Sequence, residues 1–257
     1  MLTEYQNRVN WLLQTPTASP STLYPAAFLL DCINQARGQL AGESQSILTI
    51  GTVTTVIGQR NYNFSSLNLG TPSVTGIQGA MNVSRIHYGV ASGQKFVVPR
   101  PWEYFDQYYM NNPVPVNGYP QRWSQLGQGS AGIGAITGIG SGSMSSGSFY
   151  LDPPPDAIYT LYVLCACYPI ALALDTDVES LPWIWTDAVA YFAAYLALLS
   201  AQSGQREGEA SRMLDRYGVM VERARKAANP DRLKWIFQGA PDAPQLAKFN
   251  LQGKGAA

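Results

Sequence analysis

The sequence predicts an α+β protein: a four-helix bundle formed by N- and C-terminal helix pairs, with an inserted, mostly antiparallel β domain and an extended C-terminal tail. Apolar residues recur at three- and four-residue steps near both ends of the 257-residue chain, β-branched and aromatic residues dominate its middle, and its last stretch is rich in Pro and Gly. We expect the bundle in residues 1–44 and 181–230, the β domain in 45–180 and the tail in 231–257.

Two short helices are expected before residue 45. Thr3 and Gln6 resemble a capping box at the start of the first. The second is expected to begin with Pro25 and to have Gly42 as its C-cap. Neither is long enough to be stable alone, so both need helical partners. Their apolar stripes are Leu2, Tyr5, Val9, Leu12 and Leu13, and Leu29, Ile33, Ala36 and Leu40.

The middle of the chain predicts strands. Ile47–Ile57 is rich in β-branched residues, and Gln59–Phe64 is its expected hairpin partner. Met81–Val90 and Lys95–Val98 flank a four-residue loop and predict a second hairpin. Trp102–Met110 is expected to form a short aromatic helix or turn.

A Gly/Ser segment interrupts the β region. Residues 127–148 contain eight Gly and six Ser, which predicts a flexible loop that buries no core. We expect it at the tip of a hairpin between residues 121–126 and 148–151. Ala157–Leu174 then predicts a further strand.

Helices return after Pro182. Trp183–Gln202 is apolar on nearly every side, which is typical of a buried helix. Its most apolar run, Ala188–Ser200, is expected to be too short to cross the hydrocarbon core of a membrane. Arg206–Asn229 predicts a last helix that ends before Pro230.

Arg212, Arg216 and Arg223 share one face of that last helix. This basic face could bind DNA or an acidic protein surface. Alternatively, it is a solvated face with local ion pairs to Asp215 and Glu222. The sequence alone does not favour either interpretation.

Charge is scarce and unevenly distributed. The chain has 17 basic and 17 acidic residues, and only 13% of its residues are charged. A zero net charge argues against a general nucleic-acid or membrane-surface binder, and the low charge content favours association with other proteins. Residues 1–200 nevertheless carry a net charge of −4 and residues 201–257 a net charge of +4, so the C-terminal end is a basic pole.

The residues for most catalytic or metal chemistry are missing. The three cysteines, Cys32, Cys165 and Cys167, have no zinc-site spacing and are expected to be buried thiols, and His87 is the one histidine. The acidic run 175–179 could ligate calcium, but we favour an acidic turn before a helix. We therefore predict no cofactor, no metal site and no enzymatic activity.

One alternative function involves carbohydrate. Asp152 and Asp156 flank three prolines and could be the two carboxylates of a glycosidase. Turn capping is the simpler interpretation, because Asp is common beside Pro. A carbohydrate-binding or carbohydrate-degrading tail component is therefore the alternative function.

The aromatic stretch after Pro101 is a candidate interface. Its acidic neighbours Glu103 and Asp106 would repel phosphate, so protein contact is preferred over base stacking. The candidate residues for a subunit or nozzle interface are Trp102, Tyr104, Tyr108 and Tyr109.

Four longer strings carry a family resemblance: Pro25–Arg37, Pro99–Met110, Ser148–Asp156 and Leu181–Leu196. They resemble the head-to-tail adaptor proteins of short-tailed bacteriophages, also called head-completion or tail tubular A-like proteins. The resemblance extends over most of residues 1–230, and the long segment 127–148 departs from it.

The resemblance implies a structural protein of the virion neck, made in the host cytoplasm. It implies a ring, typically of twelve copies, that lies between the portal protein and the tail nozzle protein and lets packaged double-stranded DNA pass without sequence readout. It also implies a C-terminal segment that embraces the portal. The portal-interface candidates are Arg232, Lys234, Trp235, Ile236 and Phe237.

Overall fold

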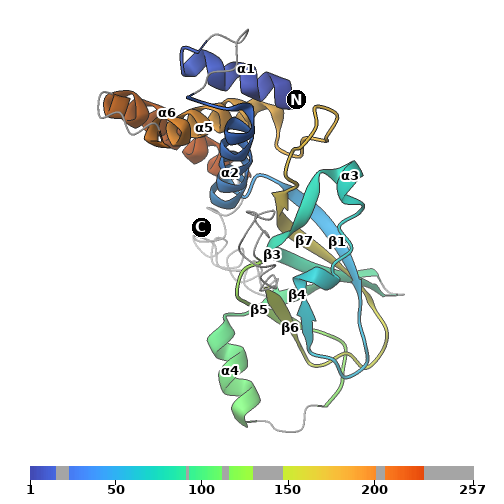
Figure 1. Ribbon diagram of the computed structural model, residues 1–257. Helices are drawn as coiled ribbons and strands as arrows, with labels where there is room; N and C mark the ends of the chain where they lie inside the picture. Colours follow the sequence, from blue (N-terminus) through green and yellow to red (C-terminus); the bar gives the residue numbers. More distant parts are fainter. Residues whose placement is uncertain (16–22, 91–92, 112–115, 130–146, 201–205, 229–257) are drawn as a thin grey trace, which may run out of the picture.

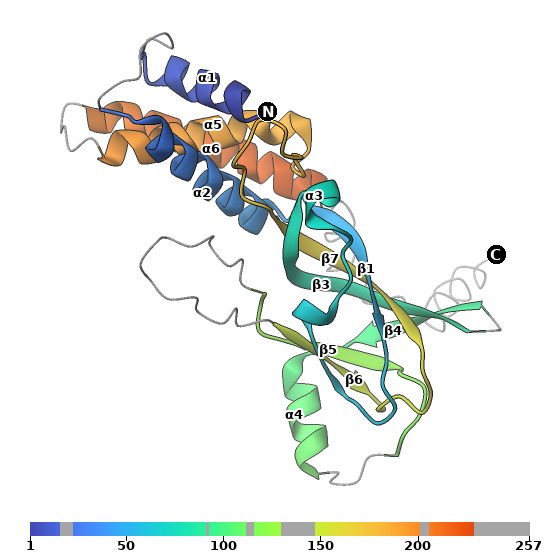
Figure 2. The ribbon, with the colours of Figure 1, turned by 45° about the vertical axis from the view of Figure 1, so that its right-hand side comes forward.

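The computed structural model describes residues 1–15, 23–90, 93–111, 116–129, 147–200 and 206–228. Over these residues the chain is α+β, with six α-helices and one seven-stranded sheet, so the predicted class is confirmed. The molecule is elongated: a layer of helices forms one end, the curled sheet forms the middle, and a single helix projects at the opposite end (Figures 1 and 2).

The helical layer consists of α1 (Leu2–Leu12), α2 (Ala26–Ser44), α5 (Thr186–Ser200) and α6 (Glu207–Ala228). Helix α5 lies in its centre and packs against the other three, while α2 also contacts α1 and α6. Alanines on α5 allow this close packing, because several of them are completely buried: Ala188, Ala193, Ala194 and Ala197.

The predicted four-helix bundle is wrong. The described chain has six helices rather than four, and α1 and α6 make no extensive contact with each other, whereas α2 and α5 pack together across the layer. The two remaining helices, α3 (Pro72–Thr75) and α4 (Trp102–Asn111), lie in the β region. The physical reason is α5: it is apolar on most sides, so α1, α2 and α6 gather around it, and their buried side chains continue into one core with those of the sheet.

Two predicted helix ends are also wrong. Helix α1 has no side-chain cap, so Thr3 and Gln6 do not form a capping box. Helix α2 continues past Gly42 to Ser44, whose hydroxyl donates a hydrogen bond of 2.6 Å to the Leu40 carbonyl. Gln45 then takes the left-handed conformation, at φ 53°, that ends the helix.

The sheet has the strand order β1-β7-β3-β4-β5-β6-β2 and is antiparallel except for the β4–β5 pair. Its central strands β3 and β7 are the longest. Its curl brings the two ends of the strand order close, because Thr52 of β1 bridges to Asn68, which follows β2. The strands are β1 (Leu48–Thr54), β2 (Asn61–Asn63), β3 (Ile77–Val90), β4 (Gly93–Pro99), β5 (Arg122–Leu126), β6 (Ser148–Asp152) and β7 (Thr160–Pro169).

Two predicted hairpins are confirmed and one is wrong. Strand β3 pairs with β4, and β5 pairs with β6 around the Gly/Ser segment, most of which lies outside the described residues. Strands β1 and β2 do not pair with each other: β1 pairs with β7 and β2 with β6. Helix α4 is confirmed as a short aromatic helix.

A buried ion pair joins the helical layer to the sheet. Arg37 of α2 donates two hydrogen bonds to the Glu179 carboxylate, of 2.9 and 2.8 Å, and one of 2.6 Å to the Ile170 carbonyl just after β7. The Tyr5 hydroxyl of α1 donates to the same carboxylate at 2.9 Å. The two charged side chains are only 1% and 4% exposed. This network therefore fixes α1, α2 and the connection between β7 and α5 against one another.

One helical segment, Trp183–Ser200, is long and apolar enough to cross a membrane by length and composition. It comprises the short 3-10 helix η2 (Trp183–Trp185) and α5. Core helices of globular proteins pass the same test, and α5 is the central helix of the layer.

Candidate protein-association surfaces

The basic face predicted for the last helix lies on the outer side of α6. Arg212, Arg216 and Arg223 are all exposed, and none forms an ion pair with another described residue. The ion pair considered between this basic face and Glu222 does not form, because the Glu222 carboxylate pairs with Lys226 at 3.2 Å and with Arg225 at 3.7 Å. Three guanidinium groups therefore remain available to a partner.

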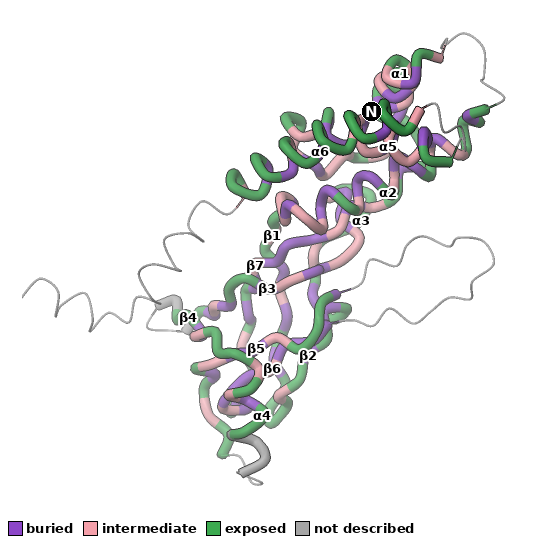
Figure 3. Tube along the Cα trace, turned by 90° about the vertical axis from the view of Figure 1, so that its left-hand side faces the viewer, coloured by how far each residue is buried: buried purple, intermediate pink, exposed green. Residues whose placement is uncertain are grey.

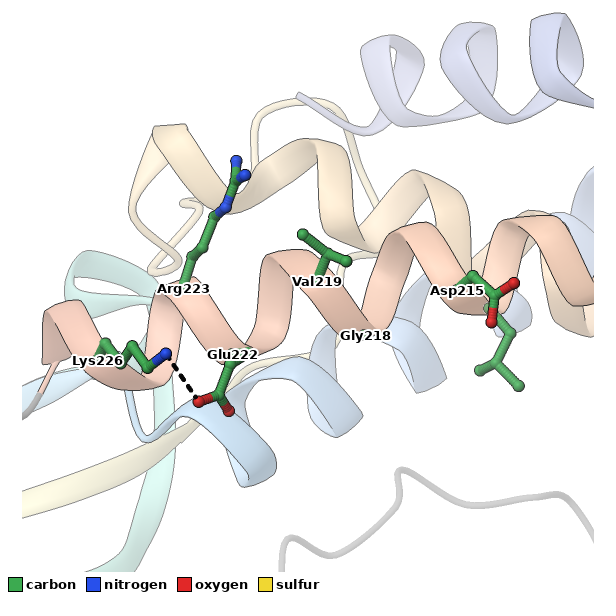
Figure 4. Close-up of a pocket in the computed structure, with 7 residues that line it drawn as sticks. Asp215, Gly218, Val219, Glu222, Arg223 and Lys226 are labelled. Carbon is green, nitrogen blue, oxygen red and sulfur yellow. Dashed lines mark ion pairs between the residues drawn. The ribbon is translucent and has the colours of Figure 1, made fainter.

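The surroundings of this basic row are open and partly apolar. The lining of a shallow depression on α6 includes Val219, Gly218 and Arg223, and Val219 is 54% exposed. Figure 4 shows Arg223 and Val219 rising from one side of the helix, with Lys226 turned to Glu222 on another side. Figure 3 shows the same helix with a largely exposed outer surface. The arrangement suits a broad contact with a macromolecule better than a small ligand.

A second open surface is the side of α5 that no other described helix covers. Tyr191 and Tyr195 are partly exposed, and Leu199, one turn further, is 52% exposed. The sequence predicted a buried helix here, but these side chains of α5 remain partly or largely exposed. Trp183, just before α5, is 78% exposed. Exposed apolar side chains that gather on one helix are typical of a protein-contact site.

A third surface crosses the outer face of the sheet. The strand register places Tyr162 of β7, His87 of β3 and Phe96 of β4 side by side. His87 stacks on Tyr162, with ring centroids 5.3 Å apart, and lies 5.7 Å from Phe96. Phe96 is 62% exposed, and Ile50 of β1 is 56% exposed. His87 is thus one member of an aromatic row.

Two of the predicted interface residues on helix α4 also contact the sheet. The Trp102 ring packs against Tyr150 of β6, with centroids 4.9 Å apart, and Arg122 of β5 donates a hydrogen bond of 2.7 Å to the Tyr104 hydroxyl. Both side chains thereby anchor the projecting helix to the sheet. The side chains of Tyr108 and Tyr109 lie outside the described part of the structure.

The acidic run 175–179 does not converge on a common ligand. Asp175 accepts a hydrogen bond from the Met1 amino group at 2.8 Å and another from the Thr3 amide, which together lower its pKa to about 2. The amides of Leu174 and Ala173 lower the pKa of Asp177. Glu179 belongs to the Arg37 pair. Each carboxylate therefore has a separate structural partner.

The two aspartates of the carbohydrate alternative also have separate partners. The Asp152 carboxylate is buried and lies 3.4 Å from Arg122. Asp156 is exposed and accepts a hydrogen bond of 2.7 Å from the Tyr159 hydroxyl. Each of these two carboxylates is therefore held by a partner of its own in the described part of the chain.

The three cysteines are buried. Burial raises the pKa of the Cys32 thiol to about 11 and the pKa values of Cys165 and Cys167 to about 12. They therefore remain protonated near neutral pH and are poor nucleophiles.

The portal-interface candidates, Arg232, Lys234, Trp235, Ile236 and Phe237, lie outside the described residues, as does the rest of the C-terminal segment.

Sequence reasoning missed the exposed sheet face and the open stripe of α5. A signal for the sheet face was present, because Leu48 and Ile50 alternate with residues that the fold places inward. Which of the two faces stays open depends on packing with distant segments, and the sequence does not show that packing.

A family model described as SU10 adaptor protein matches residues 2–234. No curated protein was found to match the chain.

Proposed function

Because this chain belongs to the SU10 adaptor protein family, a family of bacteriophage head-to-tail adaptors, we propose that it forms a ring in the virion neck that joins the portal protein to the tail nozzle protein. The family is structural, and its members are virion components that associate with other phage head and tail proteins. Packaged double-stranded DNA would pass through the ring, which we expect to contain twelve copies.

The observation that carries this proposal is the family match, which includes every described residue except Met1. The geometry agrees with it. The described surface offers three broad contact areas, on α6, α5 and the sheet, each with exposed side chains suited to protein contact. Such areas, rather than a concave site with convergent polar groups, are typical of a subunit in an assembly.

We further propose that residues 231–257 bind the portal. The candidates Trp235 and Phe237 are large aromatic side chains, which are frequent anchors of protein interfaces, and Arg232 and Lys234 add positive charge beside them. Portal binding by this segment would allow the subunit to be made separately and to assemble only where the portal is present.

Removal of residues 231–257 tests this part of the proposal. The shortened chain should keep the circular dichroism spectrum and melting behaviour of the full chain but should no longer bind portal-bearing particles that lack tails. The full chain and a Lys95→Ala variant, altered on the sheet, are the matched controls and should both bind. Normal binding by the shortened chain would refute the role assigned to the C-terminal segment.

A further inference from the structure

We infer that one copy of the chain packs the open side of α5 and the basic row of α6 against the outer face of α2 in a second copy. This inference rests on the proposed ring, and it names the two surfaces that would meet between neighbouring subunits.

The first surface combines an apolar stripe and positive charge. Tyr191, Tyr195 and Leu199 recur every four residues and so follow one side of α5. At about 100° per residue, Tyr191 and Tyr195 point away from the completely buried Ala193. Since α2 packs against the buried side of α5, the stripe faces away from α2.

The basic row lies on the same side of the layer. Tyr217 of α6 contacts Phe192 of α5, with ring centroids 4.5 Å apart, and Arg225 reaches the Glu43 carbonyl of α2 at 3.0 Å. Around the α6 axis, Arg225 lies about 80° to one side of Tyr217, whereas Arg216 and Arg223 lie about 100–120° to the other side. The row therefore points away from α2 and flanks the open side of α5.

The second surface is the outer face of α2. Asp31, Gln35 and Gly38 follow this face, and a methyl group added to Gly38 would meet no atom within 4 Å, whereas one added to Gly42 would meet Tyr168 of β7. Asp31 is exposed and forms no ion pair with a described residue. The one basic residue of α2, Arg37, is buried with Glu179. This face is therefore slim at Gly38, and its exposed carboxylate, Asp31, is opposite in charge to the arginines of the first surface.

The two surfaces point in opposite directions. Helices α2 and α5 contact each other across the layer, so their uncovered sides lie on opposite faces of it. A chain with complementary surfaces on opposite faces associates head to tail, and such contacts close into a ring when the rotation between copies permits.

A second copy fits the first surface better than DNA does. Phosphates would satisfy the three arginines but would not cover the exposed parts of the two tyrosines and of Leu199. A head or tail protein of another kind would explain one of the two surfaces but not their complementarity. Both of these occupants are outcomes that the experiment below distinguishes.

Photo-crosslinking in the assembled particle tests the inference. A benzophenone amino acid replaces Tyr195 in the full chain, the variant is bound to purified portal protein, and the adducts are mapped by mass spectrometry. We expect adducts within residues 26–44 of another copy. Adducts on the portal, on DNA or on a different surface of the chain would overturn the inference while leaving the proposed ring intact. Failure to form any multimer on the portal would overturn both.

Charge reversal provides an independent check. Arg216→Glu with Arg223→Glu should weaken multimer formation on the portal about tenfold or more, because it places like charges opposite Asp31. Adding Asp31→Arg should restore most of the loss. Lys95→Glu, an exposed reversal on the sheet, is the matched control and should have no effect. A loss that Asp31→Arg does not relieve would contradict the assigned pairing.

Discussion

Replacement of Arg37 by Met should strongly destabilise the protein. The change removes both guanidinium hydrogen bonds to Glu179 and leaves a carboxylate that is 4% exposed. That carboxylate keeps only the Tyr5 hydroxyl and the Leu181 amide, at 2.9 and 3.0 Å. Removing one partner of a buried ion pair typically costs about 3–5 kcal/mol, which corresponds to a fall in Tm of about 6–20 °C for a chain of this size.

The assay is chemical and thermal unfolding followed by circular dichroism, with a double-mutant cycle. The double variant Arg37→Met/Glu179→Leu should lose less free energy of unfolding than the two single variants lose in sum, by at least about 2 kcal/mol. The reason is that the double variant has no unpaired buried charge. Arg8→Met, which breaks the exposed pairs with Glu4 and Asp187, is the control and should cost about 1 kcal/mol or less.

Two results would refute this reasoning. The first is a single-variant cost no larger than that of Arg8→Met. The second is strict additivity in the cycle. Either would mean that the Arg37–Glu179 pair does not fix the helical layer to the sheet.

Three further predictions follow from the packing and the titrating groups. The pKa of Asp175 is about 2 in the folded chain, below its ordinary value of 3.8. The carboxylate therefore stabilises the fold above about pH 4, and this stabilisation is lost as the pH falls towards 2. Asp175→Asn should reduce the decline of Tm between pH 4 and pH 2, and an unchanged decline would contradict the role assigned to Asp175. Ala193→Leu should overpack the centre of α5 and cost about 1–3 kcal/mol in denaturant unfolding, whereas a neutral effect would show that the layer is looser than described. Cys165 and Cys167 should resist a thiol reagent at pH 7 until the protein unfolds, and rapid labelling of the native chain would show that β7 is not buried as described.

Local sequence patterns predicted helix α2 and two of the hairpins, because these elements depend on residues that are close in sequence. The stripe from Leu29 to Leu40 follows the buried side of α2, and the β3–β4 and β5–β6 hairpins join strands that are close in sequence. The pairing of β1 with β7 joins residues more than a hundred positions apart. Alternation within Leu48–Thr54 shows that a strand forms but carries no information about its neighbour.

The candidate site was harder to predict because surface function depends on what the fold leaves uncovered. Trp102 and Tyr104 are predicted interface residues, and the sequence did not show that Tyr150 and Arg122 also contact them. Arg37, one position after the buried Ala36, has the sequence context of a solvated helix residue. It is buried because Glu179 comes from the other end of the chain to pair with it. Such tertiary partners have no signature in a single sequence.

The most direct test of the central proposal is the native mass of the full chain with and without purified portal protein. The chain has a mass of 28.0 kDa. We expect it to bind the portal as a closed multimer, which for twelve copies adds about 336 kDa to the mass of the portal, or twelve times the mass of one chain. An unchanged portal mass, or the addition of a single copy, would contradict the assignment of this protein as a ring-forming adaptor subunit.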